Sequence, residues 1–169
     1  GTKIAAGVFD GKRLLSKVVV PTPKEGGERV AEALAEAAER AEREAGVRGE
    51  AIGLGTPGPL DFRRGVIRFA PNIPGVQDFP IRRILEEATG RPVFLENDAN
   101  AAALAEHHLG AAQGAESSLY LTVSTGIGGG VVLGGRERRG EGGQGGERGH
   151  LTLLPGGPAC GGGLEGWAG

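Results

Sequence analysis

The sequence contains very little cysteine, no methionine and few aromatic residues. Its 169 residues include one Cys, one Trp, one Tyr and five Phe. The single cysteine, Cys160, excludes a framework of intrachain disulfides and agrees with a reducing compartment. No stretch approaches the roughly 20 apolar residues that a membrane-spanning helix needs. We therefore expect a cytoplasmic protein with no membrane partner.

The charges are nearly balanced. The 19 basic and 21 acidic residues leave a net charge of -2, which gives no basic surface suited to nucleic acid. A small-molecule ligand is the better expectation. Abundant Arg and Glu without Met is typical of a thermophilic source.

Glycine is the residue in excess, with 34 copies concentrated after Gly114. Such density suits tight turns or backbone that approaches a ligand, with a flexible linker as the alternative. Strand-like segments between the glycines favour strands and turns.

The first 112 residues alternate strand and helix patterns. Period-two and short apolar runs predict strands over residues 4–9, 14–20, 51–54, 66–69 and 93–95. Amphipathic patterns bounded by glycine predict helices over residues 25–45, 80–88 and 99–109. This alternation predicts an α/β layer with a mixed sheet. We expect a first domain over residues 1–112 and a partial second domain over residues 113–169, with strands at 119–123, 130–133 and 150–154.

The segment 96–102, ENDANAA, places polar residues at the end of a predicted strand. Phosphoryl transfer needs a carboxylate that accepts the proton of the attacking hydroxyl, and a neighbouring amide can orient the substrate. Asp98 and Asn97 meet these two needs. Either residue is also a favoured helix N-cap, and this alternative stays open.

Two further segments contain residues that can contact a substrate. In the segment 147–150, ERGH, Glu147 and His150 can offer an acceptor and a donor to adjacent hydroxyls. The segment 124–130, STGIGGG, is predicted to lie between two strands, where backbone N–H groups and hydroxyls can face phosphate. A glycine loop alone is weak evidence for such a site.

Six segments of the sequence, taken in their order along the chain, match one protein family specifically. The sequence resembles the ROK family (repressor, open reading frame, kinase) of sugar kinases in GTKIAAGVFDG, GLGTPGPLD, APNIPG, LENDANAAALAE, VSTGIGGGVV and GERGHLTLLPGGPACG. The resemblance implies an α/β, actin-like ATPase fold of two domains that binds ATP and Mg²⁺ in its cleft. It implies phosphorylation of a hexose, glucose first, with polyphosphate as the alternative donor and a homo-oligomer as the complete form.

The resemblance also implies residue roles. Asp98 is the catalytic base, and the sugar is held by Asn97, Glu147 and His150, with Gly58 on a loop beside it. The implied phosphate contacts are Thr125, Gly126, Gly128 and Gly129, together with Thr2 and Lys3 at the end of the first phosphate motif.

The sequence departs from the family in two respects. The acidic start of the first phosphate motif and the adenine-contacting segment are missing, so we expect the 169-residue chain to be inactive. His150 and Cys160 are a possible remnant of a zinc site, but Gly162 and Trp167 stand where the other cysteines are expected. A structural zinc normally has four protein ligands. The alternatives to a kinase are a sugar-sensing transcriptional regulator of the same family and a noncatalytic sugar-binding fragment.

Overall fold

The computed structural model describes residues 2–11, 13–70, 73, 75–123, 127–138 and 157. The contacts divide the chain into two compact units, Gly1–Glu96 and Asn97–Gly169. A domain boundary after residue 112 stays a prediction. No helix in these described ranges combines the length and the apolar character that crossing a bilayer requires.

The elements follow the predicted alternation. The helices are α1 (Gly27–Ala45), α2 (Ile81–Thr89) and α3 (Asp98–Leu109). The strands of the first unit are β1 (Lys3–Asp10), β2 (Arg13–Pro21), β3 (Ile52–Thr56), β4 (Leu60–Asp61), β5 (Val66–Phe69), β6 (Gln77–Phe79) and β7 (Val93–Asn97). The remaining strands are β8 (Ser117–Val123), β9 (Ile127–Leu133) and β10 (Arg136–Glu137).

The strands of the described residues form four ladders, three in the first unit and one in the second. Their orders are β1-β2, β3-β7, β4-β5-β6 and β10-β9-β8. An apolar pattern indicates that a segment is a strand, but it does not name the strand's neighbour. The sequence therefore predicts the elements without naming which strands pair.

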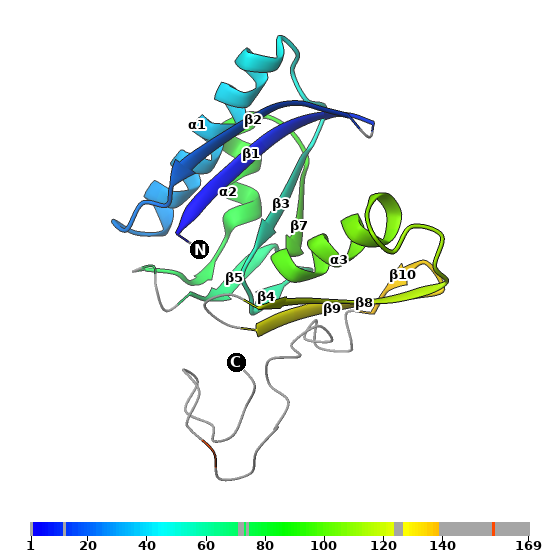
Figure 1. Cartoon of the computed structure of the whole chain (residues 1–169). Coiled ribbons are helices and arrows are strands. Elements are labelled where there is room, and N and C mark those ends of the chain that lie inside the picture. The colour runs from blue at the N-terminus through cyan, green and yellow to red at the C-terminus, as the bar shows by residue number, and fades with distance from the viewer. Residues whose placement is uncertain are drawn as a thin grey trace. The chain divides into compact units, whose positions relative to one another are not determined.

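The first unit is built around α1, which lies along the β1–β2 hairpin (Figure 1). Gly11, at the turn of this antiparallel hairpin, has a positive φ of 60°. The helix meets the hairpin through small side chains, because Ile4 packs with Ala33 and Ala37, and Val8 packs with Ala41. Alanine at these positions lets the helix backbone come close to the strands.

The main core of this unit lies where α1, α2 and strands β3 to β7 meet. Its buried residues are Ala31, Leu54, Leu60, Ile67, Val76, Phe79, Ile81, Leu85, Val93 and Leu95. Both helices of the unit end at a glycine in the left-handed region, Gly46 after α1 and Gly90 after α2. The glycine stops predicted from sequence are therefore confirmed.

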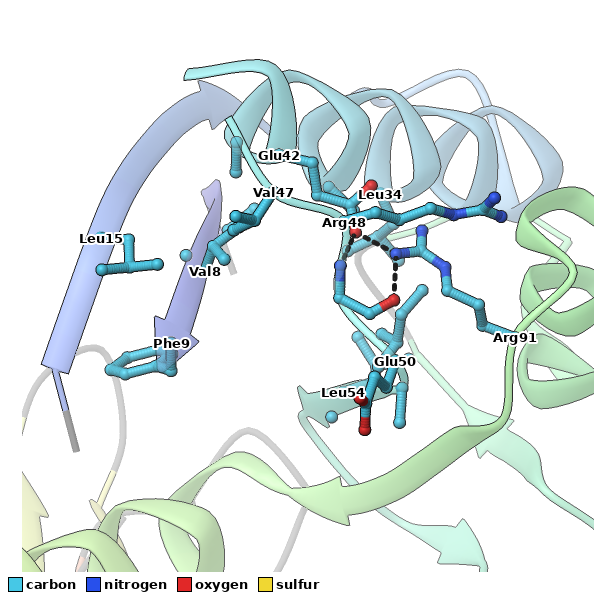
Figure 2. Close-up of a pocket in the computed structure, with 18 of the residues that line it drawn as sticks. Val8, Phe9, Leu15, Leu34, Glu42, Val47, Arg48, Glu50, Leu54 and Arg91 are labelled. Atoms are coloured by element: carbon cyan, nitrogen blue, oxygen red, sulfur yellow. Dashed lines mark hydrogen bonds and ion pairs between the residues drawn. The ribbon is translucent and has the colours of Figure 1, made fainter. Parts of the chain in front are cut away.

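A buried ion pair joins distant parts of this unit. Arg91, which precedes β7, contacts Glu42 of α1, and their side chains are only 7% and 15% exposed. The Glu42 carboxylate also accepts the backbone N–H of Gly49 at 2.8 Å. Figure 2 shows this cluster, in which Arg91 also donates to the carbonyl of Gly49 at 3.3 Å. The cluster fixes the segment between α1 and β3 against both neighbours.

Candidate active site

The predicted catalytic segment lies at the junction of β7 and α3. Asn97 ends the strand in extended backbone and is the N-cap of the helix. Its Oδ1 accepts the backbone N–H groups of Ala99 at 3.0 Å and Asn100 at 3.2 Å. The capping role that the sequence left open is thus confirmed for Asn97. Asp98 is the first residue of the helix.

Asp98 combines a local hydrogen bond with exposure. Its Oδ1 accepts the N–H of Ala99 at 2.9 Å, and the residue as a whole is exposed. Asn97 is half-buried beside it. The cap therefore fixes the first turn of α3 while the Asp98 carboxylate stays accessible to a substrate. A carboxylate held in this way can accept a proton from a bound hydroxyl.

Glycines of β9 lie directly against the first turns of α3, which packs on β8 and β9 (Figure 1). A Cβ added at Gly128 would lie 3.3 Å from the Cβ of Ala99, and one at Gly130 would lie 2.5 Å from the Cβ of Ala103. The second distance is too short for any side chain. Gly130 is therefore required for packing.

The structure corrects the predicted extent of the glycine loop. Residues 124–130 were expected to lie between strands, yet β9 begins at Ile127, and Gly128, Gly129 and Gly130 pair with β8. Glycine is a poor strand former, so its pattern favoured a turn. The antiparallel partner and the close approach of α3 decide the outcome instead.

The sequence-predicted site residues divide into three groups. Asn97, Asp98, Gly128 and Gly129 all belong to the second unit, where Gly128 lies against Ala99, the residue after Asp98. Thr2, Lys3 and Gly58 belong to the first unit, where the carbonyl of Thr2 accepts the N–H of Thr22 at 3.1 Å and Gly58 is half-buried after β3. Residues outside the described ranges are Thr125, Gly126, Glu147, His150, Cys160, Gly162 and Trp167.

Asn100 is a polar residue that the sequence analysis did not single out. It lies in the first turn of α3, is only 2% exposed, and has an Oδ1 without a hydrogen-bond donor in the described part of the chain. Asparagine is unusual inside a helix because its side chain competes for backbone hydrogen bonds. An asparagine inside a predicted helix, two residues after Asp98, is the sequence feature that could have drawn attention to this residue.

The described residues provide no group of three or more His, Cys, Asp or Glu side chains that could hold a metal ion. The buried His107 instead joins α3 to β8, with its Nδ1 2.9 Å from the Oγ of Ser118. Near Gly58, the Asp61 carboxylate of β4 accepts the backbone N–H of Arg64 at 3.0 Å. That hydrogen bond, with the cations of Arg68 and Arg64, holds the pKa of Asp61 below its ordinary value.

Known proteins match nearly the whole chain. It is 94% identical to a ROK hexokinase from Thermus thermophilus in its crystal structure, with a TM-score of 0.88, covering 98% of this chain and 55% of that one. It is 41% identical over 167 residues to a glucokinase of Streptomyces coelicolor, covering 98% of this chain and 51% of the relative. A ROK family glucokinase from Streptomyces griseus, solved with glucose and AMPPNP, is also 41% identical, with a TM-score of 0.88, covering 98% of this chain and 52% of that one.

The chain thus spans about half the length of the relatives it matches. Residues 1–167 match the ROK family itself. Together with the helix cap, the exposed carboxylate and the glycine strand, this match shows that the chain belongs to the ROK family and has the α/β, actin-like ATPase fold of its hexokinases.

Proposed function

We propose that the polypeptide containing these 169 residues transfers a phosphoryl group from ATP to a hexose, with glucose 6-phosphate as the expected product. The observation that carries this proposal is the Asp98 carboxylate, exposed at the start of a helix that Asn97 caps and the glycines of β9 contact. The similar Streptomyces griseus glucokinase was solved with glucose and AMPPNP, which supports both substrates.

The proposed reaction divides the work among the site residues. The sugar hydroxyl oxygen bonds to the γ-phosphorus, the bond from that phosphorus to the leaving oxygen of ADP breaks, and Asp98 accepts the hydroxyl proton. In this proposal Asn97 orients the sugar, and its side chain is held by two backbone N–H groups. In this proposal Glu147, His150 and Gly58 hold the sugar.

In this proposal the glycine-rich segment around β9 contacts the phosphates of the nucleotide. The proposal gives phosphate contacts to Gly128 and Gly129, with Thr125 and Gly126 before them and Thr2 and Lys3 from the first unit. Mg²⁺ would accompany the phosphates, since this ion commonly binds through one or two carboxylates and substrate oxygens while keeping several waters. A cage of three protein ligands is not needed for that mode.

The kinase is favoured over the other two functions. A sugar-sensing regulator of the same family is the first alternative and a noncatalytic sugar-binding fragment the second. Identity of 94% to a hexokinase and 41% to glucokinases supports the kinase. The proposal also places the reaction in the cytoplasm, within glycolysis, and expects a homo-oligomer.

A coupled assay with glucose and ATP tests the proposal on two proteins, the 169-residue chain and a longer polypeptide that contains it. We expect turnover by the longer protein alone, because the acidic start of the first phosphate motif and the adenine-contacting segment are missing here. Parallel assays with polyphosphate and with N-acetylglucosamine, N-acetylmannosamine, fructose and allose define the donor and the sugar. Sugar binding by the longer protein without transfer from any donor would refute the kinase function.

A further inference from the structure

Asn100 places an amide group inside the contact between α3 and β9. The residue is 2% exposed and is among the largest fully buried side chains of the described residues. A Cβ added at Gly130 of β9 would lie 3.2 Å from the Cα of Asn100. The strand therefore crosses the helix at this residue, with no space for a side chain on the strand.

The amide of Asn100 is not needed to form the helix. The cap of α3 is Asn97, whose Oδ1 already accepts the backbone N–H of Asn100 at 3.2 Å. The Oδ1 of Asn100 has no donor in the described part of the chain. Burying an amide oxygen without a donor is unfavourable, and alanine, which occupies positions 99 and 101–103, is the stronger helix former. For stability alone, alanine would suit position 100 better than asparagine.

His107, on the same helix, shows the contrasting case of a buried polar side chain with a structural partner. It is 6% exposed, and its Nδ1 lies 2.9 Å from the Oγ of Ser118. That contact joins α3 to β8. Asn100 is more deeply buried than His107 but makes no comparable side-chain contact to a strand among the described residues.

Asn100 lies between the two groups that the proposed reaction must align. Asp98, the proposed base, begins the same helix two residues earlier. Gly128 and Gly129, the proposed phosphate contacts, belong to the strand that crosses at Asn100. A shift of α3 along β9 would move the carboxylate relative to the phosphates. A misplacement of about 1 Å can slow a reaction by about 100-fold, so this register matters for the rate.

We propose that Asn100 is a positioning residue for phosphoryl transfer. Its amide oxygen accepts a hydrogen bond from an N–H or O–H group in the complex with both hexose and nucleotide, and this bond fixes α3 against β9. Asp98 is then held in the register at which it accepts the hydroxyl proton. Asn100 acts through Asp98 and does not itself react, and the inference rests on the proposed kinase function.

Asn100→Ala in the longer polypeptide tests the inference. We expect kcat to fall at least about tenfold, whereas the affinity for glucose alone, titrated directly, should stay within about threefold. The melting temperature without ligands should stay level or rise, because the buried amide oxygen is removed and alanine favours the helix. With glucose saturating, AMPPNP should raise the melting temperature less than it does in the wild type, because the bond forms only in the complex with both ligands.

Two further variants separate positioning from packing. Asn100→Leu fills the space without an amide oxygen and should stay as slow as Asn100→Ala. Ser118→Ala leaves the buried Nδ1 of His107 without its partner, so it should lower the melting temperature and keep the kcat of the wild type.

The wild type of the longer polypeptide separates the two ways of failing. If it phosphorylates glucose, a normal kcat in Asn100→Ala, recovery of kcat in Asn100→Leu, or failure of both Asn100 variants to fold would overturn the inference alone. A wild type that binds glucose but transfers no phosphoryl group would overturn the proposed function, and the positioning role with it.

Discussion

Asn97 and Asp98 are adjacent in sequence but have different tasks in the proposed site. Asn97 uses its Oδ1 on two backbone N–H groups, whereas Asp98 is exposed. Fixing the helix end and accepting the proton are thereby assigned to different side chains, and Asn97 orients the sugar in addition. Substitutions should separate the two tasks.

We expect Asp98→Asn, in the longer polypeptide, to lower kcat by at least about 100-fold, because Asn cannot take the hydroxyl proton. Glucose affinity should stay within about tenfold, and the melting temperature should barely change, because Asn keeps the shape and the local hydrogen bond. Kinetics, direct titration of glucose and thermal unfolding of both proteins check this. A near-normal kcat in the folded variant would leave Asp98 as a structural residue.

Gly130 gives a second prediction at this scale. Gly130→Val should lower the free energy of unfolding by about 1–3 kcal/mol, because its Cβ would lie 2.5 Å from the Cβ of Ala103. Gly53→Val is the matched control, since a Cβ added at Gly53 meets nothing within 4 Å. The control should change stability by at most about 0.5 kcal/mol. Denaturant unfolding of both variants provides the comparison, and equal effects would argue against the close packing of α3 on β9.

At the scale of elements, a charged cluster adds to the apolar packing of α1 by joining it to the segments that precede β3 and β7. Removing one partner of a buried ion pair leaves the other charge unpaired, which costs about 3–5 kcal/mol. Glu42→Ala should approach that loss because Arg91 is 7% exposed. Glu44→Ala, in the exposed pair with Arg40, should cost at most about 1 kcal/mol. Urea unfolding measures both.

A double variant sharpens this prediction. Glu42→Met combined with Arg91→Met removes both charges and should be less destabilised than Glu42→Ala alone. If the double variant is the less stable of the two, an unpaired Arg91 charge is not the cause of the loss.

The sequence predicted the long elements and missed the short ones. The helix α1 has a period of 3.6 over many residues and a glycine stop, so its pattern is unambiguous. The strands β4, β6 and β10 have only two or three residues each, too few to show any period. They exist because neighbouring segments offer hydrogen-bonding partners, and a local pattern does not contain that information.

For the candidate site, too, the sequence predicted the local features but not the contacts between distant segments. The segment ENDAN indicated both the cap and the carboxylate, and the structure confirms that Asn97 is the cap. The placement of Gly128 against Ala99 depends on how β9 meets α3, which is a contact between segments about 30 residues apart in the sequence. The buried Asn100 depends on the same contact.

At the scale of the whole molecule, the chain has about half the length of its relatives and divides into two compact units. The metal content is a property of the complete 169-residue chain. We expect less than stoichiometric zinc, because the sequence offers His150 and Cys160 where a structural site needs four ligands. Elemental analysis after purification without added metal, followed by mild chelation, measures this. One tightly held zinc per chain would contradict the expectation.

The packing of β9 on α3 affects how a mutational scan of the glycine-rich segment is interpreted. A mutational scan scored by sugar phosphorylation would find Gly130 as intolerant as a residue that touches the nucleotide, although its restriction comes from the Ala103 methyl group. A parallel scan scored by protein abundance separates the two causes. Changes at Gly130 would fail in both scans, whereas changes at Asp98 would fail only in the first. Within this glycine-rich segment, intolerance by itself therefore does not map the ligand.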